Sequence, residues 1–244
     1  MNPTFGKTTA IAALALLLAT GLGAHDKGFG VSSFYFETRV GYEAAFPGMD
    51  FNADASGFRG SFLNMRLDGQ ICEGLTYSYR QRFNKLSDRT FFDATDWIHI
   101  DWKATDWFTL GGGKQVVGIG GYEYDRAPID LYYCSEFWNN IACYQLGISG
   151  TFSVAPGDNL LLQVCNSPMR GYITDDSGNN VGNSKVAVNL MWYGSHGFYE
   201  SIWSANAFQN STDSWMYYVA LGNRFNITEW LRWDIDLMDR LGKG

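Results

Sequence analysis

From residue 30 onward, apolar and polar positions alternate along the chain in segments of about ten residues. In residues 75–83, for example, Leu75 and Tyr77 lie on one side of an extended chain, and Arg80 and Arg82 lie on the other. Successive side chains of a strand point to opposite faces. The pattern therefore predicts strands with one apolar and one charged face, which suit either a soluble β-sandwich or a transmembrane barrel.

The connections between the predicted strands mostly alternate between long and short. Ala104-Thr105, Pro156-Gly157 and Asn226-Ile227 are tight, whereas residues 116–141 form the longest connection. Bacterial outer-membrane barrels combine short periplasmic turns with longer external loops. The connections of a Greek-key sandwich are not expected to alternate in length in this way. The ninth connection, residues 210–214, is short where the parity predicts a long one. The predicted strands cover residues 30–42, 57–68, 74–85, 95–103, 106–115, 142–155, 158–166, 184–193, 198–208, 214–225 and 228–238.

These patterns predict an all-β protein, a transmembrane antiparallel β-barrel. The alternative is a secreted β-sandwich that binds glycans, with Trp and Tyr side chains as stacking platforms. Single-chain bacterial barrels have even strand numbers, and an open sheet edge is costly in lipid. Because the predicted strand count is odd, we expect the chain to be the N-terminal portion of a longer barrel of about sixteen strands.

The first residues predict export. Lys7 precedes an apolar run over residues 10–22, and small residues follow up to Ala24. This is the pattern of a secretory signal peptide cleaved near Ala24, and the apolar run is short for a membrane span. We therefore expect a signal peptide over residues 1–24 and a mature barrel over residues 25–244 in the bacterial outer membrane.

Composition and charge agree with a barrel in a lipid bilayer. The chain has 28 Gly, 5 Pro and 16% aromatic residues. Trp107 and Trp230 each open a strand directly after a polar turn, where the aromatic girdle of an outer-membrane barrel lies. The formal net charge of −7 argues against a nucleic-acid partner.

The longest connection carries the residues of a family resemblance. It follows the glycine-rich stretch 111–115 and contains the stretch 121–130, GYEYDRAPID. Together with the leader and the short strands, these segments resemble trimeric outer-membrane porins, most closely the phosphate-selective porin family and its Bacteroidota relatives. The resemblance implies a homotrimer, in contact with lipopolysaccharide, for passive diffusion of ions and small hydrophilic solutes. It does not assign phosphate selectivity, because the lumenal Arg and Lys ladder of the family is not matched position by position.

In porins, the third external loop folds into the lumen and narrows it. The resemblance therefore implies an in-folded constriction loop over residues 116–141, with a short helix over residues 131–139. The constriction residues that it implies are Tyr122, Glu123, Tyr124, Asp125, Arg126, Asp130 and Glu136.

The alternation also predicts which side chains line the pore. If apolar positions face lipid, four arginines from three neighbouring strands form a basic wall, because adjacent strands lie about 4.8 Å apart. Opposite the loop acids Glu123, Asp125, Asp130 and Glu136, this wall would create a transverse field, and charges of this kind set ion selectivity. The alternative is that the arginines are solvated or pair with Glu37, Asp68 or Asp101. The predicted pore-lining residues are Arg39, Arg66, Arg80, Arg82, His99, Asp101, Lys103, Arg224 and Arg232.

Other chemistry is weakly indicated. The chain has no HExxH, GxSxG or P-loop motif, so no catalytic residue, cofactor or metal is predicted. The acidic stretch around Asp175 and Asp176 reads as a solvated loop, because its spacing differs from that of an EF-hand. Cys134 and Cys143 flank the predicted loop helix and could form a disulfide in an exported protein, although four cysteines allow three pairings.

Overall fold

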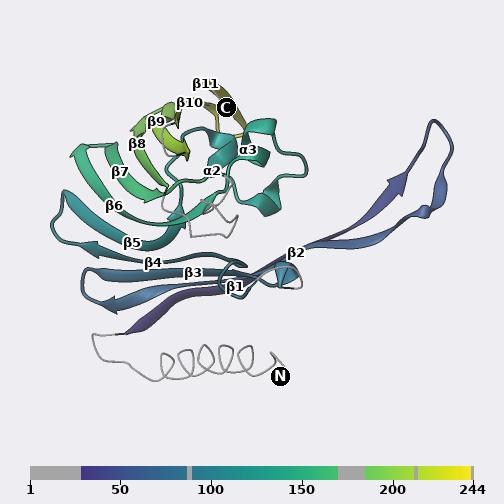
Figure 1. Ribbon diagram of the computed structural model, residues 1–244, viewed down its shortest axis with the longest axis horizontal. Helices are drawn as coiled ribbons and strands as arrows, with labels where there is room; N and C mark the ends of the chain where they lie inside the picture. Colours follow the sequence, from purple (N-terminus) through teal and green to yellow (C-terminus); the bar gives the residue numbers. More distant parts are fainter. Residues whose placement is uncertain (1–28, 87–89, 170–184, 212–213, 243–244) are drawn as a thin grey trace. The chain divides into compact units, whose positions relative to one another are not determined.

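The computed structural model describes residues 29–86, 90–169, 185–211 and 214–242. The predicted signal peptide lies outside these residues. In the described part of the chain, eleven strands form one antiparallel sheet in sequential order, as predicted (Figure 1). The strands are β1 (Gly30–Ala45), β2 (Asn52–Cys72), β3 (Leu75–Arg82), β4 (Thr95–Lys103), β5 (Phe108–Val116), β6 (Tyr144–Ala155), β7 (Asp158–Asn166), β8 (Val186–His196), β9 (Tyr199–Ser211), β10 (Ser214–Thr228) and β11 (Leu231–Leu241).

This sequential order corresponds to a barrel wall and differs from a sandwich, whose two sheets exchange strands. No helix in the described ranges is long and apolar enough to cross a membrane. The chain divides into two compact units, residues 1–98 and residues 99–244, which are described separately below.

In the first unit, β2 pairs with β1 over almost its whole length and with β3 only over its second half. Gly30 lies opposite Gln70 in the first pair, and Asn64 lies opposite Arg82 in the second. A short 3-10 helix, η1 (Phe83–Lys85), follows β3. Residues 83–85 were predicted as strand, so β3 ends earlier than the alternation indicated.

The first connection is much shorter than predicted. Residues 43–56 were expected to form a long loop, but β1 continues to Ala45 and β2 begins at Asn52. The polar residues Asn52 and Asp54 read as a loop in the sequence because such residues favour turns. In the structure, pairing between the two strands overrides this local preference. Tyr42 lies opposite Phe58 and Glu43 lies opposite Gly57, so the two segments pair as a β-hairpin.

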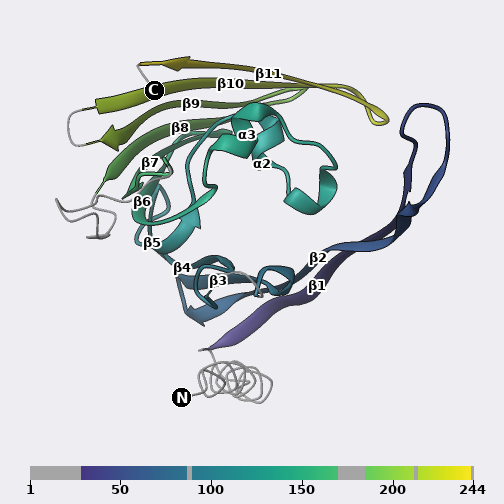
Figure 2. The same ribbon diagram turned by 45° about the vertical axis from the view of Figure 1, so that its right-hand side comes forward.

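In the second unit, β5 to β11 form a meander, with tight turns between β6 and β7, between β8 and β9, and between β10 and β11. Gly157 has a φ of 86°, which suits the turn between β6 and β7, because glycine adopts positive φ at little cost. The longest connection, residues 117–143, carries α2 (Tyr122–Asp125), η2 (Pro128–Asp130) and α3 (Glu136–Asn140). Figure 2 shows α2 and α3 within the curve of strands β6–β11. We call residues 117–143 the crossing segment, and the sheet face that it covers the inner face.

The predicted helix over residues 131–139 is only partly present. Helix α3 begins at Glu136, because the Ser135 side chain accepts a hydrogen bond from the backbone N–H of Trp138 and so caps the helix at this point. The residues before Ser135 form the short η2 turn and irregular backbone. The loop helix is therefore shorter than the sequence indicated, and it starts later.

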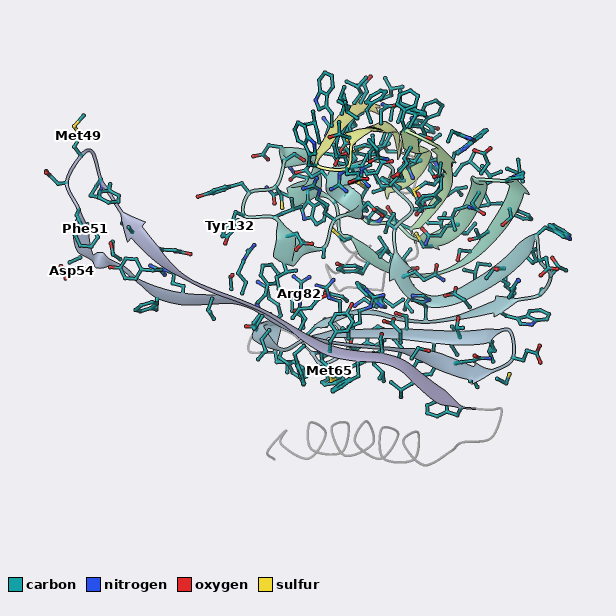
Figure 3. The ribbon with its side chains drawn as sticks, turned by 180° about the vertical axis from the view of Figure 1, so that it is seen from behind. Met49, Phe51, Asp54, Met65, Arg82 and Tyr132 are labelled. Carbon is teal, nitrogen blue, oxygen red and sulfur yellow. The ribbon has the colours of Figure 1, made fainter. Side chains whose placement is uncertain are left out.

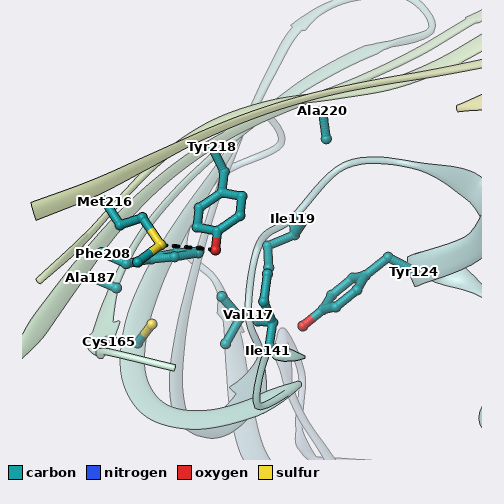
Figure 4. Close-up of a cluster of buried hydrophobic side chains, with 10 residues drawn as sticks. All are labelled: Val117, Ile119, Tyr124, Ile141, Cys165, Ala187, Phe208, Met216, Tyr218 and Ala220. Carbon is teal, nitrogen blue, oxygen red and sulfur yellow. Dashed lines mark hydrogen bonds between the residues drawn. The ribbon is translucent and has the colours of Figure 1, made fainter. Parts of the chain in front are cut away.

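Apolar side chains of the crossing segment pack on the inner face (Figure 4). Val117, Ile119 and Tyr124 contact side chains of β7–β10, among them Phe208 and Tyr218. The Tyr218 hydroxyl donates to the sulfur of Met216 at 3.0 Å. This cluster buries the apolar side of the segment against the sheet, and burial of this kind is the main favourable term in folding.

The opposite, outer face carries the predicted apolar stripes. Val186, Val188, Leu190 and Trp192 are all at least 40% exposed, although they lie in the middle of the meander. Near the turns, Trp107 stacks on Phe152, and Phe225 contacts both Tyr199 and Trp233. An apolar outer band with aromatic side chains near the strand ends is typical of a transmembrane barrel.

Candidate pore lining and crossing segment

In the first unit, the predicted arginines are held by carboxylates. The Arg80 side chain is 2% exposed and pairs with Glu37 at 2.7 Å and with Asp96 at 3.5 Å. Arg82 donates to the same Asp96 oxygen at 2.9 Å. A buried charge is tolerated only when it is paired, so Arg80 and its two partners form one electrostatic unit.

Arg66 and Arg39 are also held in place. Arg66 donates to Asp68 at 2.8 Å and lies 5.4 Å from the ring centre of Trp97. Arg39 donates to Ser61 at 2.9 Å, and its guanidinium lies 4.5 Å from the ring centre of Phe62. The structure thus brings Arg66, Arg80 and Arg82 together, each with a carboxylate partner.

Asp96 and Trp97 were missed by the sequence reasoning. Strict alternation assigns Asp96 to the face of Ile98, away from the arginines. Instead, Asp96 accepts from Arg82, and its neighbour Trp97 donates to Ser78 at 2.7 Å. Two consecutive residues thus contact the same polar face, so the period of two fails at the start of β4. No sequence signal marks such an irregularity.

The remaining predicted side chains of β4 belong to the second unit and form local pairs. His99 and Asp101 lie on the same side of the strand, with 3.0 Å between His99 Nδ1 and Asp101 Oδ2. Lys103 pairs with the exposed Asp106 at 2.8 Å, across the turn to β5. Lys103 therefore lies at the strand end.

A ladder of neutral side chains attaches the first part of the crossing segment to the inner face. The backbone N–H of Gly118 donates to Gln163 at 2.8 Å, and the Gly118 carbonyl accepts from Asn206 at 2.7 Å. The backbone N–H of Gly120 donates to Ser204 at 2.8 Å. Asn189 joins Gln163 to Asn206 through bonds of 2.9 and 2.8 Å. These buried side chains form hydrogen bonds with backbone N–H and C=O groups of a segment that is no longer paired with a neighbouring strand.

Glycines allow the backbone of the segment to approach the wall closely. A Cβ atom on Gly120 would lie 2.6 Å from the carbonyl oxygen of Ile202, and one on Gly222 would lie 2.7 Å from the Cα of Gly121. Gly121 has a φ of 102°, which disfavours any larger residue. Gly121 belongs to the stretch 121–130 that carries the family resemblance, whereas Gly120 and Gly222 were not predicted from the sequence.

The start of α2 is bound by a wall carboxylate. Asp236 on β11 accepts from the backbone N–H groups of Tyr122 and Glu123, at 2.9 and 2.8 Å. The Tyr122 ring lies under the guanidinium of Arg224, at 3.7 Å from the ring centre. Burial raises the pKa of Tyr122 to about 12, although Arg224 opposes the shift. The phenol is therefore neutral at physiological pH.

Three predicted arginines converge on one carboxylate beside this contact. Arg224 donates to both oxygens of Asp234, at 2.8 and 3.1 Å, and Arg126 donates to one of them at 2.9 Å. Arg232 approaches Asp234 at 3.8 Å. The side chains of Arg126 and Arg232 remain about half exposed, at 43% and 53%. A cavity of about 650 Å³ lies beside them, lined by Arg126, Asn226, Thr228, Glu229, Trp230, Leu231, Arg232 and Asp234.

The remaining residues that were predicted for the constriction loop also lie in the crossing segment. Glu123 accepts from the backbone N–H of Ser135 at 2.7 Å, which ties α2 to the start of α3. Tyr124 is buried in the apolar cluster. Asp125 ends α2, Asp130 ends η2 and Glu136 begins α3.

Cys134 and Cys143 are thiols in the structure, so the disulfide considered from the sequence is not formed there. The Cys143 side chain is turned toward the Ile141 carbonyl and packs against the apolar cluster. Within the described residues, no group of three or more His, Cys, Asp and Glu side chains is placed to hold a metal ion.

A meander of antiparallel strands, apolar on its outer face and crossed on its inner face by an in-folded connection, defines the architecture of a porin. Comparison with known families agrees. Phosphate-selective porin O and P matches residues 34–200, more than half of the chain, and the protein belongs to this family of outer-membrane channels. Comparisons with curated proteins and with solved structures give no match.

Proposed function

We propose that the protein is a passive diffusion channel for ions and small hydrophilic solutes that is narrowed by the crossing segment. The observation that supports this proposal is the attachment of the crossing segment to the inner face of β7–β11 by the ladder of neutral side chains and by Asp236. A segment held in this way stays in the path of solutes. Export with cleavage near Ala24, assembly as a homotrimer and contact with lipopolysaccharide belong to the same proposal.

We also propose that the channel prefers anions, phosphate among them, and that Arg126 and Arg232 supply this preference. Arg66, Arg80 and Arg82 each have a carboxylate partner, which reduces their effect on a passing ion. Arg126, Arg224 and Arg232 instead converge on Asp234, and Arg224 also lies 3.6 Å from Glu200. Arg126 and Arg232 line the cavity with half-exposed side chains. Glu229 also lines the cavity and offsets part of this charge. Lumenal charges of this kind set ion selectivity.

The test is the reversal potential of the full-length protein in a planar bilayer under a KCl gradient. We expect discrete conductance steps with an anion-favouring potential, and a shift toward cations in the double variant Arg126→Gln, Arg232→Gln. Lys103→Gln is the control for the loss of a positive charge away from the cavity, because it removes one such charge at an exposed turn. A wild type that favours cations would indicate that the acidic residues Glu123, Asp125 and Asp130 set the ion selectivity. An absence of conductance would contradict the proposed channel function.

A further inference from the structure

The cavity beside Asp234 is larger than a simple inorganic anion needs. Its volume is about 650 Å³, and it lies next to the turn that joins β10 to β11. One water molecule takes up about 30 Å³ of liquid water, whereas sites for small organic ligands have volumes of about 300–1,000 Å³. An inorganic anion such as phosphate would fill only a small part of this cavity. The volume therefore suits an organic solute.

An exposed aromatic ring forms part of the cavity lining. Trp230 lies in the turn before β11 and is 82% exposed. In the part of the chain that the structure describes, its ring contacts no other aromatic ring and no cation, whereas Trp107 stacks on Phe152. The indole therefore has an open face. An aromatic face is electron-rich, so it attracts the C–H face of a sugar ring, whose hydrogens carry a partial positive charge.

Two half-exposed cations line the same cavity. Arg126 donates to Asp234 at 2.9 Å, whereas Arg232 lies 3.8 Å from it, which is longer than a hydrogen bond. A guanidinium has five N–H donors, so both side chains keep donors for a solute. A carboxylate accepts two parallel N–H groups from one guanidinium. The two arginines are therefore suited to a carboxylate group on the solute.

The polar side chains of the turn favour hydroxyl groups and oppose a second negative charge. Glu229 and Thr228 line the cavity and are exposed. Among the described residues, neither side chain has a hydrogen-bond or ion-pair partner. An ionised carboxylate accepts hydrogen bonds from hydroxyl groups but repels anions. Because Asp234 also lies in the lining, the charge balance favours a solute with several hydroxyl groups and a single negative charge over a multiply charged phosphate.

We propose that this cavity binds sugar acids, which are cyclic sugars that carry one carboxylate. Trp230 stacks on the sugar ring, Arg126 and Arg232 bind the carboxylate, and Glu229 and Thr228 bind hydroxyl groups. The role of this site rests on the proposed function, because it names a class of solute that the anion-preferring channel admits. Since Arg126 belongs to the crossing segment, a bound sugar acid is held beside that segment.

The test is isothermal titration of the full-length protein in detergent with D-glucuronate, a sugar ring with one carboxylate. Methyl glucoside supplies the ring without the charge, acetate supplies the carboxylate without the ring, and inorganic phosphate supplies a multiply charged anion. We expect glucuronate to bind about ten times more tightly than each of these compounds. Equal affinity for glucuronate and any one of them would overturn the proposal.

Two variants separate the contributions of the ring and the charge. Trp230→Ala should weaken glucuronate binding about tenfold and leave acetate binding unchanged, whereas Arg232→Gln should weaken the binding of both. Tyr132→Ala is the matched control, because Tyr132 is 80% exposed and projects from the crossing segment but is not among the lining residues of the cavity (Figure 3). Far-UV circular dichroism checks that each variant keeps its strands. An unchanged glucuronate affinity in Trp230→Ala, or an equal loss in Tyr132→Ala, would overturn the proposal.

The KCl conductance of the wild type in a planar bilayer separates this proposal from the proposed function. A protein that conducts but binds glucuronate no more tightly than acetate would contradict only the sugar-acid site. A protein that binds glucuronate as expected but does not conduct would support the site and contradict only the channel.

Discussion

The guanidinium of Arg224 lies 3.7 Å from the ring centre of Tyr122 and so joins a wall strand to the crossing segment. The same guanidinium is held by both oxygens of Asp234, which fixes its plane over the ring. A guanidinium over an aromatic face contributes about 0.5–2 kcal/mol, depending on its exposure. This contact makes Tyr122 a sensitive reporter of whether the segment is docked.

We predict that the docking of the crossing segment on the inner face of the sheet weakens in strong alkali. The pKa of Tyr122 is raised from 10.0 to about 12 in the docked state, chiefly by burial. Below pH 10, the phenol is neutral in both states and docking is unaffected. As the pH rises from about 10 to about 12, an undocked Tyr122 loses its proton first, so docking becomes less favourable. Tyrosinate absorbance of the wild type minus that of Tyr122→Phe measures this, and ionisation of Tyr122 at its ordinary pKa would contradict it.

We predict that Asp236→Asn loosens the start of α2. The carboxylate accepts two backbone N–H groups, whereas an amide has one oxygen and carries no charge. Hydrogen bonds to a charged group contribute about 1.5–3 kcal/mol each, so single-channel recordings should show stronger current fluctuations. Asp239→Asn is the control, because Asp239 is an exposed residue of the same strand that bonds only the adjacent Arg240 N–H in the described contacts. Equal noise in the two variants would argue against an anchoring role for Asp236.

We predict that Gly222→Ala displaces the crossing segment. The added Cβ would lie 2.7 Å from the Cα of Gly121 and 3.0 Å from the Ile202 carbonyl oxygen, which are both backbone atoms. Overpacking of this kind costs about 1–3 kcal/mol, so limited proteolysis should cleave the segment faster than in the wild type. Gly112→Ala is the matched control, because nothing lies within 4 Å of the Cβ position at Gly112. Cleavage at the wild-type rate in Gly222→Ala would contradict the close approach.

We predict that Arg80→Met destabilises the first unit strongly. It would leave Glu37 and Asp96, whose side chains are 15% and 8% exposed, without their shared cation. Removing one partner of a buried ion pair costs about 3–5 kcal/mol. The free energy of unfolding in urea, followed by Trp fluorescence, measures the loss. The control Arg59→Met breaks an exposed pair and should cost less than about 1 kcal/mol. Similar costs for the two variants would contradict the buried character of the Arg80 cluster.

The sequence anticipated the strands with the clearest alternation. Residues 95–103 and 158–166 were predicted with the bounds that β4 and β7 have in the structure. It also anticipated the apolar outer stripe from Val186 to Trp192. The prediction of the first connection was wrong, because loop-favouring residues such as Asn52 and Asp54 lie in a hairpin whose cross-strand partners compensate for them.

For the site, the sequence alone determined which residue types lie on which face of most strands, because alternation with a period of two is a local property. It thereby named Arg80 and Arg224 as inward-facing, and the same alternation places Gln163 on that face. Only the tertiary structure decided what each of them contacts. Asp96 joins Arg80 through an irregularity in β4, Tyr122 lies under Arg224, and Gln163 binds the backbone of Gly118. These partners are 16, 102 and 45 residues apart in the chain, and no local pattern fixes which distant groups the folded backbone brings within bonding distance.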